Sequence, residues 1–220
     1  MGTTTEAIRE RPRLYLISPP KIDLDSFETA FQEALAGGDI ACFQLRLKDR
    51  PAEEIIAATR RLMPIAEKAN VAFLLNDDVE LAKELLVDGV HVGQDDMSYK
   101  QARDILGPEA IIGVTCKNSK HLAMSAGEDG ADYVAFGAFF PTATKMNTVK
   151  AEPEILEWWS ETTLIPSVAI GGITVNNAAG LINSGADFLA ISGGVWEYAD
   201  GPKEAVAAFN REIDKAVTSW

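Results

Sequence analysis

The choice of fold for this chain depends on whether the stretch FQLRLKD, residues 43–49, lies at the edge or in the interior of a sheet. Its side chains alternate between apolar and polar, which indicates a β-strand because successive side chains of a strand point to opposite faces. One face carries a polar row of Gln44, Arg46 and Lys48. On an edge strand this row would face water, whereas on a central strand it would line a site. The place of the strand in its sheet therefore decides what the row does.

Similar strand-like segments recur along the whole chain. Eight of them are each followed by a segment with the apolar periodicity of a helix. The strand-like segments are LYLIS (14–18), ACFQLRL (41–47), VAFLLN (71–76), GVHVG (89–93), IIGVTC (111–116), DYVAFGAF (132–139), IPSVAIGG (165–172) and DFLAISGG (187–194). Apolar strands that alternate with helices predict a parallel sheet with helices on its outer face.

The number of repeats favours a closed barrel. Eight β-α units within 220 residues fit the lower size limit of an α/β fold of the (β/α)8 TIM-barrel type. A doubly wound open sheet is the alternative, but it usually has fewer strands and leaves strand edges exposed. We predict a single TIM barrel over residues 13–220, after an N-terminal extension of residues 1–12.

A barrel has no edge strand, so the polar row of residues 44–48 must reach the open mouth. An unpaired charge in an apolar interior is costly, and barrel sites lie at the carboxyl ends of the strands. Polar residues also lie at the ends of other predicted strands or in the loops that follow them, namely Asn76, Asp77, Asp96, Thr115, Thr142, Thr144 and Lys145. We expect these side chains to share one rim with the row.

Asp77 and Asp96 follow two neighbouring predicted strands and form a candidate metal site. Mg²⁺ prefers one or two carboxylates together with water and substrate phosphate oxygens. The cations Arg46, Lys48 and Lys145 would suit a diphosphate beside it. The alternative is that Asp77 and its neighbour in the sequence begin a helix as capping residues. The surrounding cations favour the magnesium site.

Glycine-rich segments follow the seventh and eighth predicted strands, at Gly171-Gly172 and at SGG, residues 192–194. Many barrels bind phosphate at these two places through backbone N–H groups and a helix N-terminus. Glycine at a strand end is often only part of a turn. The position of the glycines and the hydroxyls of Thr142 and Thr144 favour a monophosphate pocket.

The composition is that of a globular protein with a formal net charge of −13. This charge argues against nucleic acids and anionic membranes as partners. The longest apolar run, residues 133–140, is too short to span a bilayer, and the first residues lack the apolar core of a targeting segment. The two cysteines, Cys42 and Cys116, are too few for a disulfide framework, so we expect buried thiols in a cytoplasmic protein.

The histidines give little support to a nucleophilic centre. His91 lies inside an apolar run and is expected to be a core or supporting residue, and His121 begins a predicted helix. Cys116 has no evident activating base. A Ser-His-Asp or Cys-His centre is therefore not expected.

The motifs at these positions resemble those of the thiamine-phosphate synthase family, also called thiamine-phosphate pyrophosphorylase. They are QLRLKD, NDDVELA, DGVHVGQDDM, IIGVT, GADYVAFGAFFPTATK, VAIGGI and GAD, in this order from about residue 13 onward. The resemblance implies a transferase that joins hydroxymethylpyrimidine diphosphate to hydroxyethylthiazole phosphate and requires Mg²⁺. It also implies a dissociative reaction, in which pyrophosphate leaves before the thiazole nitrogen attacks.

The resemblance assigns roles to the residues of the expected rim. The diphosphate would be held by Arg46, Lys48, Asn76 and Lys145. Gln44 would orient the pyrimidine, and Thr115 replaces the usual serine and keeps its hydroxyl. Asp77 and Asp96 would bind Mg²⁺. The thiazole phosphate would be held by Thr142, Thr144, Gly172, Ser192 and Gly193, and the chemistry would depend on Arg46, Lys48, Thr115 and Lys145.

The chain departs from the family pattern at several positions, which are Leu47, Asp78, Ala138, residues 116–118 and residues 192–194. The diphosphate and metal groups are kept, so the departures fall mostly on thiazole recognition. Two alternatives therefore stay open. One is a thiazole tautomerase-like enzyme, which needs a positioned acid or base such as histidine. The other is a non-catalytic barrel that binds thiamine phosphates without turnover. Small-molecule substrates are the expected partners, and a homodimer is left open.

Overall fold

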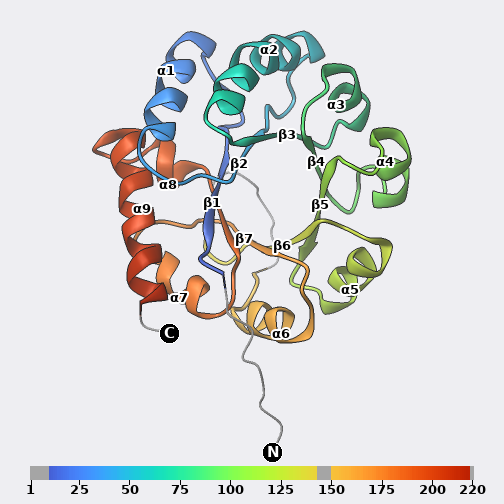
Figure 1. Ribbon diagram of the computed structural model, residues 1–220, viewed down its shortest axis with the longest axis vertical. Helices are drawn as coiled ribbons and strands as arrows, with labels where there is room; N and C mark the ends of the chain where they lie inside the picture. Colours follow the sequence, from blue (N-terminus) through green and yellow to red (C-terminus); the bar gives the residue numbers. More distant parts are fainter. Residues whose placement is uncertain (1–9, 143–149, 219–220) are drawn as a thin grey trace, which may run out of the picture.

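The computed structural model describes residues 10–142 and 150–218. Eight parallel strands close into a barrel in the order of the sequence (Figure 1). β1 completes the barrel by pairing with β8, from Arg13 opposite Phe188 to Leu16 opposite Ile191. The strands are β1 (Arg13–Ile17), β2 (Cys42–Leu45), β3 (Ala72–Asn76), β4 (Gly89–Val92), β5 (Ile111–Lys117), β6 (Tyr133–Gly137), β7 (Ser167–Ile170) and β8 (Phe188–Ile191). The predicted TIM barrel is confirmed.

Helices surround the barrel and follow each strand (Figure 1). They are α1 (Leu24–Leu35), α2 (Ala52–Lys68), α3 (Val79–Leu85), α4 (Tyr99–Leu106), α5 (Lys120–Asp129), α6 (Glu154–Thr162), α7 (Ala178–Asn183), α8 (Gly193–Trp196) and α9 (Gly201–Val217). Among these helices, α8 is an additional short helix between β8 and α9 that the sequence did not predict. None of the helices in the described ranges is long and apolar enough to cross a membrane.

Polar residues before the helices fix where several of them begin. The Asp23 carboxylate accepts the N–H of Ser26 at 3.1 Å before α1. Ser98 and Gln101 form a capping box at the start of α4. Ser119 accepts the N–H of Leu122 at the start of α5. Each cap satisfies a backbone donor that has no partner inside its helix, so the strand-to-helix turns at the rim have defined geometry.

The alternation of FQLRLKD divides β2 between two cores. Phe43 and Leu45 are 0% and 1% exposed and pack in the layer between the barrel and its helices. Phe43 contacts Phe31 there, with ring centroids 4.4 Å apart. The burial of a side chain such as Phe43 stabilises the fold by about 1.5–3 kcal/mol. The opposite face contributes to a second core inside the barrel, formed by Tyr15, Ile17, Cys42, Leu74, Tyr133, Ala135, Val168 and Ala190.

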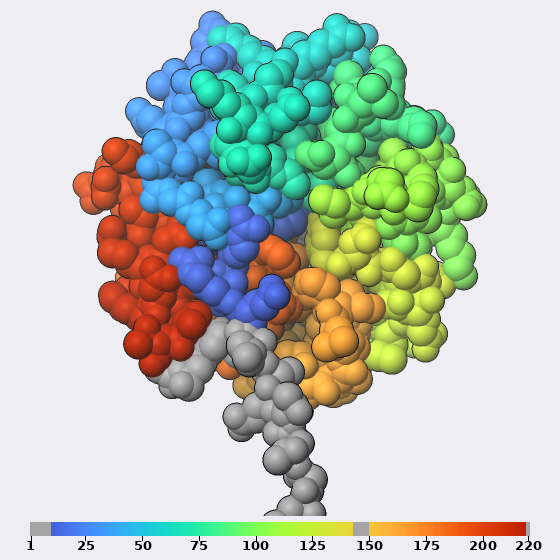
Figure 2. Space-filling model, viewed as in Figure 1, coloured from blue at the N-terminus to red at the C-terminus, as the bar shows by residue number. Residues whose placement is uncertain are grey.

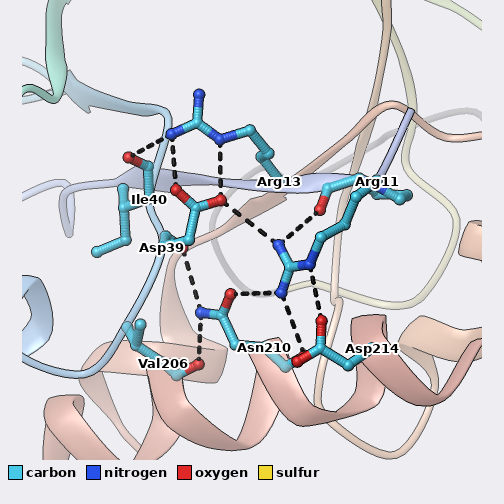
Figure 3. Close-up of polar contacts among 8 residues, drawn as sticks. Arg11, Arg13, Asp39, Ile40, Val206, Asn210 and Asp214 are labelled. Carbon is cyan, nitrogen blue, oxygen red and sulfur yellow. Dashed lines mark hydrogen bonds and ion pairs between the residues drawn. The ribbon is translucent and has the colours of Figure 1, made fainter. Parts of the chain in front are cut away.

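A network of charges at the amino-terminal end of the barrel links the start of β1 to Asp39 and α9 (Figure 3). Arg13, the first residue of β1, binds Asp39 through two hydrogen bonds of 2.8 and 2.7 Å. Arg11 donates to Asp214 at 2.7 Å and to the Asn210 side chain at 3.0 Å, so the chain before β1 is tied to α9. Figure 2 shows the dark-blue start of the described chain beside the red atoms of the C-terminal part of the chain on this face.

Candidate active site

The loop after β3 turns sharply at Asp77, which brings its carboxylate to the rim. Asp77 has a φ of 64°, in the left-handed region that aspartate tolerates better than most residues. Its backbone N–H donates to the His91 carbonyl at 2.9 Å, and its Oδ2 accepts from Nζ of Lys48 at 3.3 Å. Asp78 is the residue that caps α3, because its carboxylate accepts the N–H of Leu81 at 2.9 Å. Asp77 therefore serves the rim and not the helix.

Asp96, in the loop after β4, lies beside Asp77 and repels it. Burial raises the pKa of Asp77 above its ordinary value, the neighbouring Asp96 raises it further, and Lys48 opposes the rise. The Oδ2 atom of Asp96 accepts the N–H of Gly93 at 2.8 Å. A Cβ on Gly93 would lie 2.7 Å from that oxygen, so glycine leaves the space that the carboxylate needs. The two carboxylates are thus brought together, as the sequence predicts.

This acidic pair supplies ligands of the kind that Mg²⁺ takes. Within residues 10–142 and 150–218, no group of three or more histidine, cysteine or acidic side chains is placed to hold a metal ion. Mg²⁺ commonly uses one or two carboxylates and completes its shell with water and substrate phosphate oxygens. Burial is the largest cause of the raised pKa of Asp77, and the further rise that comes from Asp96 is a repulsion that a cation would relieve. Asp77 and Asp96 therefore fit a magnesium site that a phosphorylated ligand completes.

The polar row of Gln44, Arg46 and Lys48 begins inside the barrel, in β2, and ends at the rim. The Lys48 side chain is 50% exposed, Arg46 is half-buried, and Gln44 is only 2% exposed. The Nε2 atom of Gln44 donates to the Tyr15 hydroxyl at 2.8 Å inside the barrel. The expectation that the whole row lies in the open mouth is wrong for Gln44, which is buried at the inner end of the row. A hydrogen-bonded amide, unlike an unpaired charge, is buried at little cost.

Arg46 has a buried nitrogen that lacks a partner among the described residues. Its Nη1 atom is shielded from solvent and makes no hydrogen bond to any residue that the structure describes. A buried donor that stays unsatisfied costs about 1–3 kcal/mol, and more when it is charged. The backbone of Arg46 is held separately, because its N–H donates to Oγ of Ser18 at 2.8 Å. An anionic ligand at the rim would supply the acceptor that Nη1 needs.

Thr115 and His91 lie on neighbouring strands and bind each other. His91 Nε2 is 2.7 Å from Oγ1 of Thr115, and His91 Nδ1 is 2.9 Å from the Tyr133 hydroxyl. His91 is 8% exposed, so the prediction of a supporting residue is confirmed. Asn76 ends β3 opposite His91 in the register of the sheet and is half-buried. Gln94 reaches the same place, where its Nε2 donates to the Thr115 carbonyl at 2.7 Å.

Close backbone contacts join the segments that follow β6, β7 and β8. Gly172 has a φ of 61°, and a Cβ on it would lie 2.4 Å from the Pro141 carbonyl oxygen. Only glycine fits this approach. A Cβ on Gly194 would lie 2.4 Å from the carbonyl oxygen of Ile173, so the first turn of α8 lies against the segment after β7. The two predicted glycine segments are therefore neighbours in space.

Ser192 and Gly193 lie at the start of α8, and Oγ of Ser192 donates to the Ser18 carbonyl at 3.4 Å. The sequence predicted a phosphate-binding segment here but not the helix α8 itself, because a helix of four residues is too short to show an apolar period. Thr142 is half-buried and precedes residues 143–149. The predicted residues Thr144 and Lys145 lie outside the described residues.

Two tyrosines inside the barrel were not predicted from the sequence as part of the site. Tyr15 and Tyr133 are 3% and 6% exposed, and their hydroxyls are 2.9 Å apart. The alternation of β6 carries the signal, because Tyr133 shares a face with Ala135 inside the barrel. A buried tyrosine needs a partner for its hydroxyl. The buried thiol predicted for Cys116 is confirmed, and burial raises its pKa to about 12.

These features define an α/β TIM-barrel protein with a polar site at the carboxyl ends of its strands. The model of the family described as thiamine monophosphate synthase matches residues 14–195. The chain belongs to the thiamine monophosphate synthase family, and it is an enzyme of the transferase class. The family indicated by the sequence motifs is therefore confirmed.

Curated relatives and a solved structure agree with this assignment. The chain is 57% identical over 199 residues to a thiamine-phosphate synthase of Rhodospirillum centenum, with 90% of this chain and 96% of that one covered. It is 55% identical over 213 residues to one of Hyphomonas neptunium, with 94% and 96% covered. A thiamine phosphate pyrophosphorylase structure from Pyrococcus furiosus has a TM-score of 0.81 at 29% identity and covers 96% of this chain and 99% of its own.

Proposed function

We propose that this chain is a thiamine-phosphate synthase that joins hydroxymethylpyrimidine diphosphate to hydroxyethylthiazole phosphate by a dissociative, Mg²⁺-dependent route. The observation that carries the proposal is the charge arrangement at the rim. The Asp77 and Asp96 carboxylates stand together beside Lys48, and the buried Nη1 of Arg46 needs an acceptor. A magnesium diphosphate would meet both needs, because it brings a cation to the acids and oxygens to the guanidinium.

The proposed reaction requires a good leaving group and no protein nucleophile. The bond between the pyrimidine methylene carbon and the diphosphate oxygen breaks, and its electron pair leaves with pyrophosphate. The lone pair of the thiazole nitrogen then forms the new carbon–nitrogen bond. Bound Mg²⁺ would neutralise charge on the departing pyrophosphate. The chain would supply further neutralisation from Arg46 and Lys48, with Lys145 and Asn76 as additional diphosphate ligands. Thr115 would offer its hydroxyl to the pyrimidine substrate.

The second substrate would lie with its phosphate near α8. Gly172, Ser192 and Gly193 offer backbone N–H groups in segments that the close contact between Gly194 and Ile173 holds together. Thr142 and Thr144 would add hydroxyl donors from the segment after β6. Phosphate binding by such backbone groups positions the thiazole nitrogen, and positioning of two reactants can supply a large share of the rate acceleration.

No observation favours the tautomerase alternative. His91 contacts Tyr133 and Thr115 through both ring nitrogens, and His121 is exposed in α5 on the outside of the barrel. Neither is placed as an acid or base at the rim. A cytoplasmic location and a homodimer stay predictions from the sequence.

The test is pyrophosphate release by the purified protein with both substrates, with Mg²⁺ or with a chelator. We expect release that needs both substrates and the metal, accompanied by thiamine phosphate. Binding of both substrates without release would support the non-catalytic alternative and overturn the proposal.

A further inference from the structure

A chain of hydrogen bonds crosses the interior of the barrel and connects two predicted substrate-binding residues. It begins at Gln44, whose Nε2 donates to the Tyr15 hydroxyl at 2.8 Å. The Tyr15 and Tyr133 hydroxyls are 2.9 Å apart, and the Tyr133 hydroxyl is 2.9 Å from Nδ1 of His91. The chain ends where Nε2 of His91 lies 2.7 Å from Oγ1 of Thr115. Five side chains from β1, β2, β4, β5 and β6 are thus linked in series.

The three middle members of this interior chain are well buried. Tyr15, Tyr133 and His91 are 3%, 6% and 8% exposed. Burial raises the pKa of both tyrosines well above the ordinary value, so each keeps its hydroxyl proton. Each hydroxyl therefore has one proton to donate and can accept from its other neighbour. Water does not compete for these groups, which makes their hydrogen bonds strong and their orientations interdependent.

The ring of Tyr133 is held in one place by its surroundings. A Cβ on Gly113 would lie 1.9 Å from the ring atom that carries the hydroxyl, so glycine at this position of β5 leaves room for the ring. The His91 ring stacks on it at 5.6 Å, and the Tyr15 ring meets it edge-on at 5.9 Å between centroids. The hydroxyl at the centre of the chain therefore has a fixed position.

The interior chain has a direction, and that direction sets what both ends offer to a ligand. Gln44 donates its amide N–H to Tyr15, which leaves its carbonyl oxygen as the acceptor for a pyrimidine bound at the inner end of the row, where the proposed function puts it. If each tyrosine donates onward, Nδ1 of His91 accepts and Nε2 donates to Thr115. The Thr115 hydroxyl then has its own proton to donate to a ligand. In this direction of the chain, Gln44 offers a ligand an acceptor and Thr115 offers it a donor.

A turn of the Gln44 amide would require the whole chain to reverse. Tyr15 would have to donate to Gln44 and accept from Tyr133, and Tyr133 would have to accept from His91. The Thr115 hydroxyl would then donate to His91 and offer a ligand only an acceptor. The two ends change together, since no member can turn alone without facing a donor with a donor or an acceptor with an acceptor.

We propose that Tyr133, acting through Tyr15 and His91, is a positioning residue that locks Gln44 as acceptor and Thr115 as donor and so selects an aminopyrimidine. The inference rests on the proposed function and deepens it. An aminopyrimidine carries an amino donor together with ring nitrogens that accept, which matches the pair that the chain offers. A pyrimidinone of the same shape carries an oxygen in place of the amino group and faces the Gln44 carbonyl oxygen with a second acceptor.

The test compares pyrophosphate release from hydroxymethylpyrimidine diphosphate with release from its 4-oxo analogue. Wild-type protein should prefer the amino compound in kcat/KM, and Tyr133→Phe, which removes only the central hydroxyl, should reduce this preference by about tenfold or more. Tyr15→Phe interrupts the same chain at a second place and should act in the same direction. Tyr99→Phe is the matched control, because its hydroxyl bonds to the Gly130 carbonyl outside the barrel.

An unchanged amino-to-oxo preference in folded Tyr133→Phe and Tyr15→Phe proteins would overturn the inference, whatever their melting temperatures. If wild-type protein releases no pyrophosphate, the proposed function fails, and the preference is then read from calorimetric binding of the two diphosphates to the same variants. A preference in binding that the tyrosine substitutions remove would support the inference even then, and one that they leave intact would overturn it.

Discussion

Charged side chains are paired differently at the two ends of the barrel. At the amino-terminal end, Arg11 and Arg13 meet Asp39, Asn210 and Asp214, and opposite charges face each other (Figure 3). At the carboxyl-terminal rim, two carboxylates stand together and a guanidinium nitrogen is buried without a partner among the described residues. The first arrangement is complete within the chain. We propose that a ligand completes the second, in line with the division of a TIM barrel between a stabilising end and an active end.

Two aspartates, one at each end, have pKa values that are shifted in opposite directions. The guanidinium of Arg13 lowers the pKa of Asp39, whereas burial and the neighbouring Asp96 raise the pKa of Asp77. Ionisation of Asp39 therefore stabilises the fold at neutral pH, and ionisation of Asp77 destabilises it. In the proposed function, this unfavourable charge at the rim serves to bind the metal. Substitutions at the two ends should consequently have opposite effects on stability and activity.

The largest expected effect is the loss of catalysis in Asp96→Asn. Removal of this carboxylate should lower Mg²⁺-dependent kcat/KM by about a hundredfold or more, since one of the two predicted metal ligands is lost. The unfolding free energy of the ligand-free protein should not fall. Steady-state kinetics at several Mg²⁺ concentrations and urea unfolding measure the two quantities.

Asp95→Asn is the matched control, because Asp95 is the exposed neighbour of Asp96 in the same loop. It removes the same charge from the same loop and should leave both quantities near wild type. Equal losses in the two variants would mean that the net charge of the loop, and not a metal ligand, supports the reaction.

A comparable effect on catalysis is expected from Arg46→Met. Loss of the guanidinium should reduce kcat by about a hundredfold, the usual scale for a group that stabilises charge on a leaving group. Removal of an unsatisfied buried donor should leave the protein equally stable or more stable, by about 1 kcal/mol. Arg60→Met, on the exposed surface of α2, is the control for loss of one arginine. A normal kcat in the Arg46→Met protein would show that Arg46 takes no part in the reaction.

The glycine pair Gly172 and Gly180 compares the rim with an outer helix. Alanine at Gly172 would place its Cβ 2.4 Å from the Pro141 carbonyl oxygen at a left-handed φ of 61°. We expect a loss of about 1–3 kcal/mol in stability and a raised KM for thiazole phosphate. A Cβ on Gly180 in α7 meets nothing within 4 Å, so Gly180→Ala should stabilise by about 0.5–1 kcal/mol. Thermal melts and substrate titrations distinguish these outcomes.

The smallest effect concerns the pH dependence of stability. The lowered pKa of Asp39 contributes stability above its ordinary pKa, and that stability is lost as the pH falls through the lower folded-state pKa. Asp39→Asn should therefore cost stability at pH 7 and cost little at the acid end. The Asp39 side chain is 39% exposed, so the difference should be about 0.2–1 kcal/mol.

Asp77→Asn should show the opposite sign, because the raised pKa of Asp77 reflects a carboxylate that destabilises the fold when ionised. It should gain stability at pH 7 and lose the gain at acid pH. Urea unfolding across this pH range measures both variants. If Asp39→Asn and Asp77→Asn changed the unfolding free energy in the same direction across this pH range, the expected difference between the two ends would be wrong.

The local pattern of the sequence was sufficient to predict the barrel. Strict alternation in FQLRLKD predicted the division between Phe43 and Gln44, and the run of polar residues after the strands predicted the meeting of Asp77 and Asp96. These features follow from the side-chain period of a strand and from the common direction of parallel strands. Both are properties that short segments of sequence carry.

What could not be predicted depends on partners far away in the sequence. Gln44 is buried because Tyr15 accepts its hydrogen bond, and Tyr133 lies inside the barrel because Gly113 leaves space for its ring. Neither partner can be identified from the neighbouring sequence. The choice of Asp78 over Asp77 as the helix cap depends likewise on backbone angles in the turn. The short helix α8 has too few residues for a periodic signal.

In the proposed function, a magnesium diphosphate completes the charges of the rim. The most direct measurement is calorimetric binding of pyrophosphate to wild-type protein and to Asp96→Asn, each with Mg²⁺ and with a chelator. We predict tight binding to wild-type protein only with Mg²⁺, and weak binding to Asp96→Asn under both conditions. Pyrophosphate binding of equal strength in all four experiments would contradict the account, because the acidic pair would then play no part in holding the diphosphate.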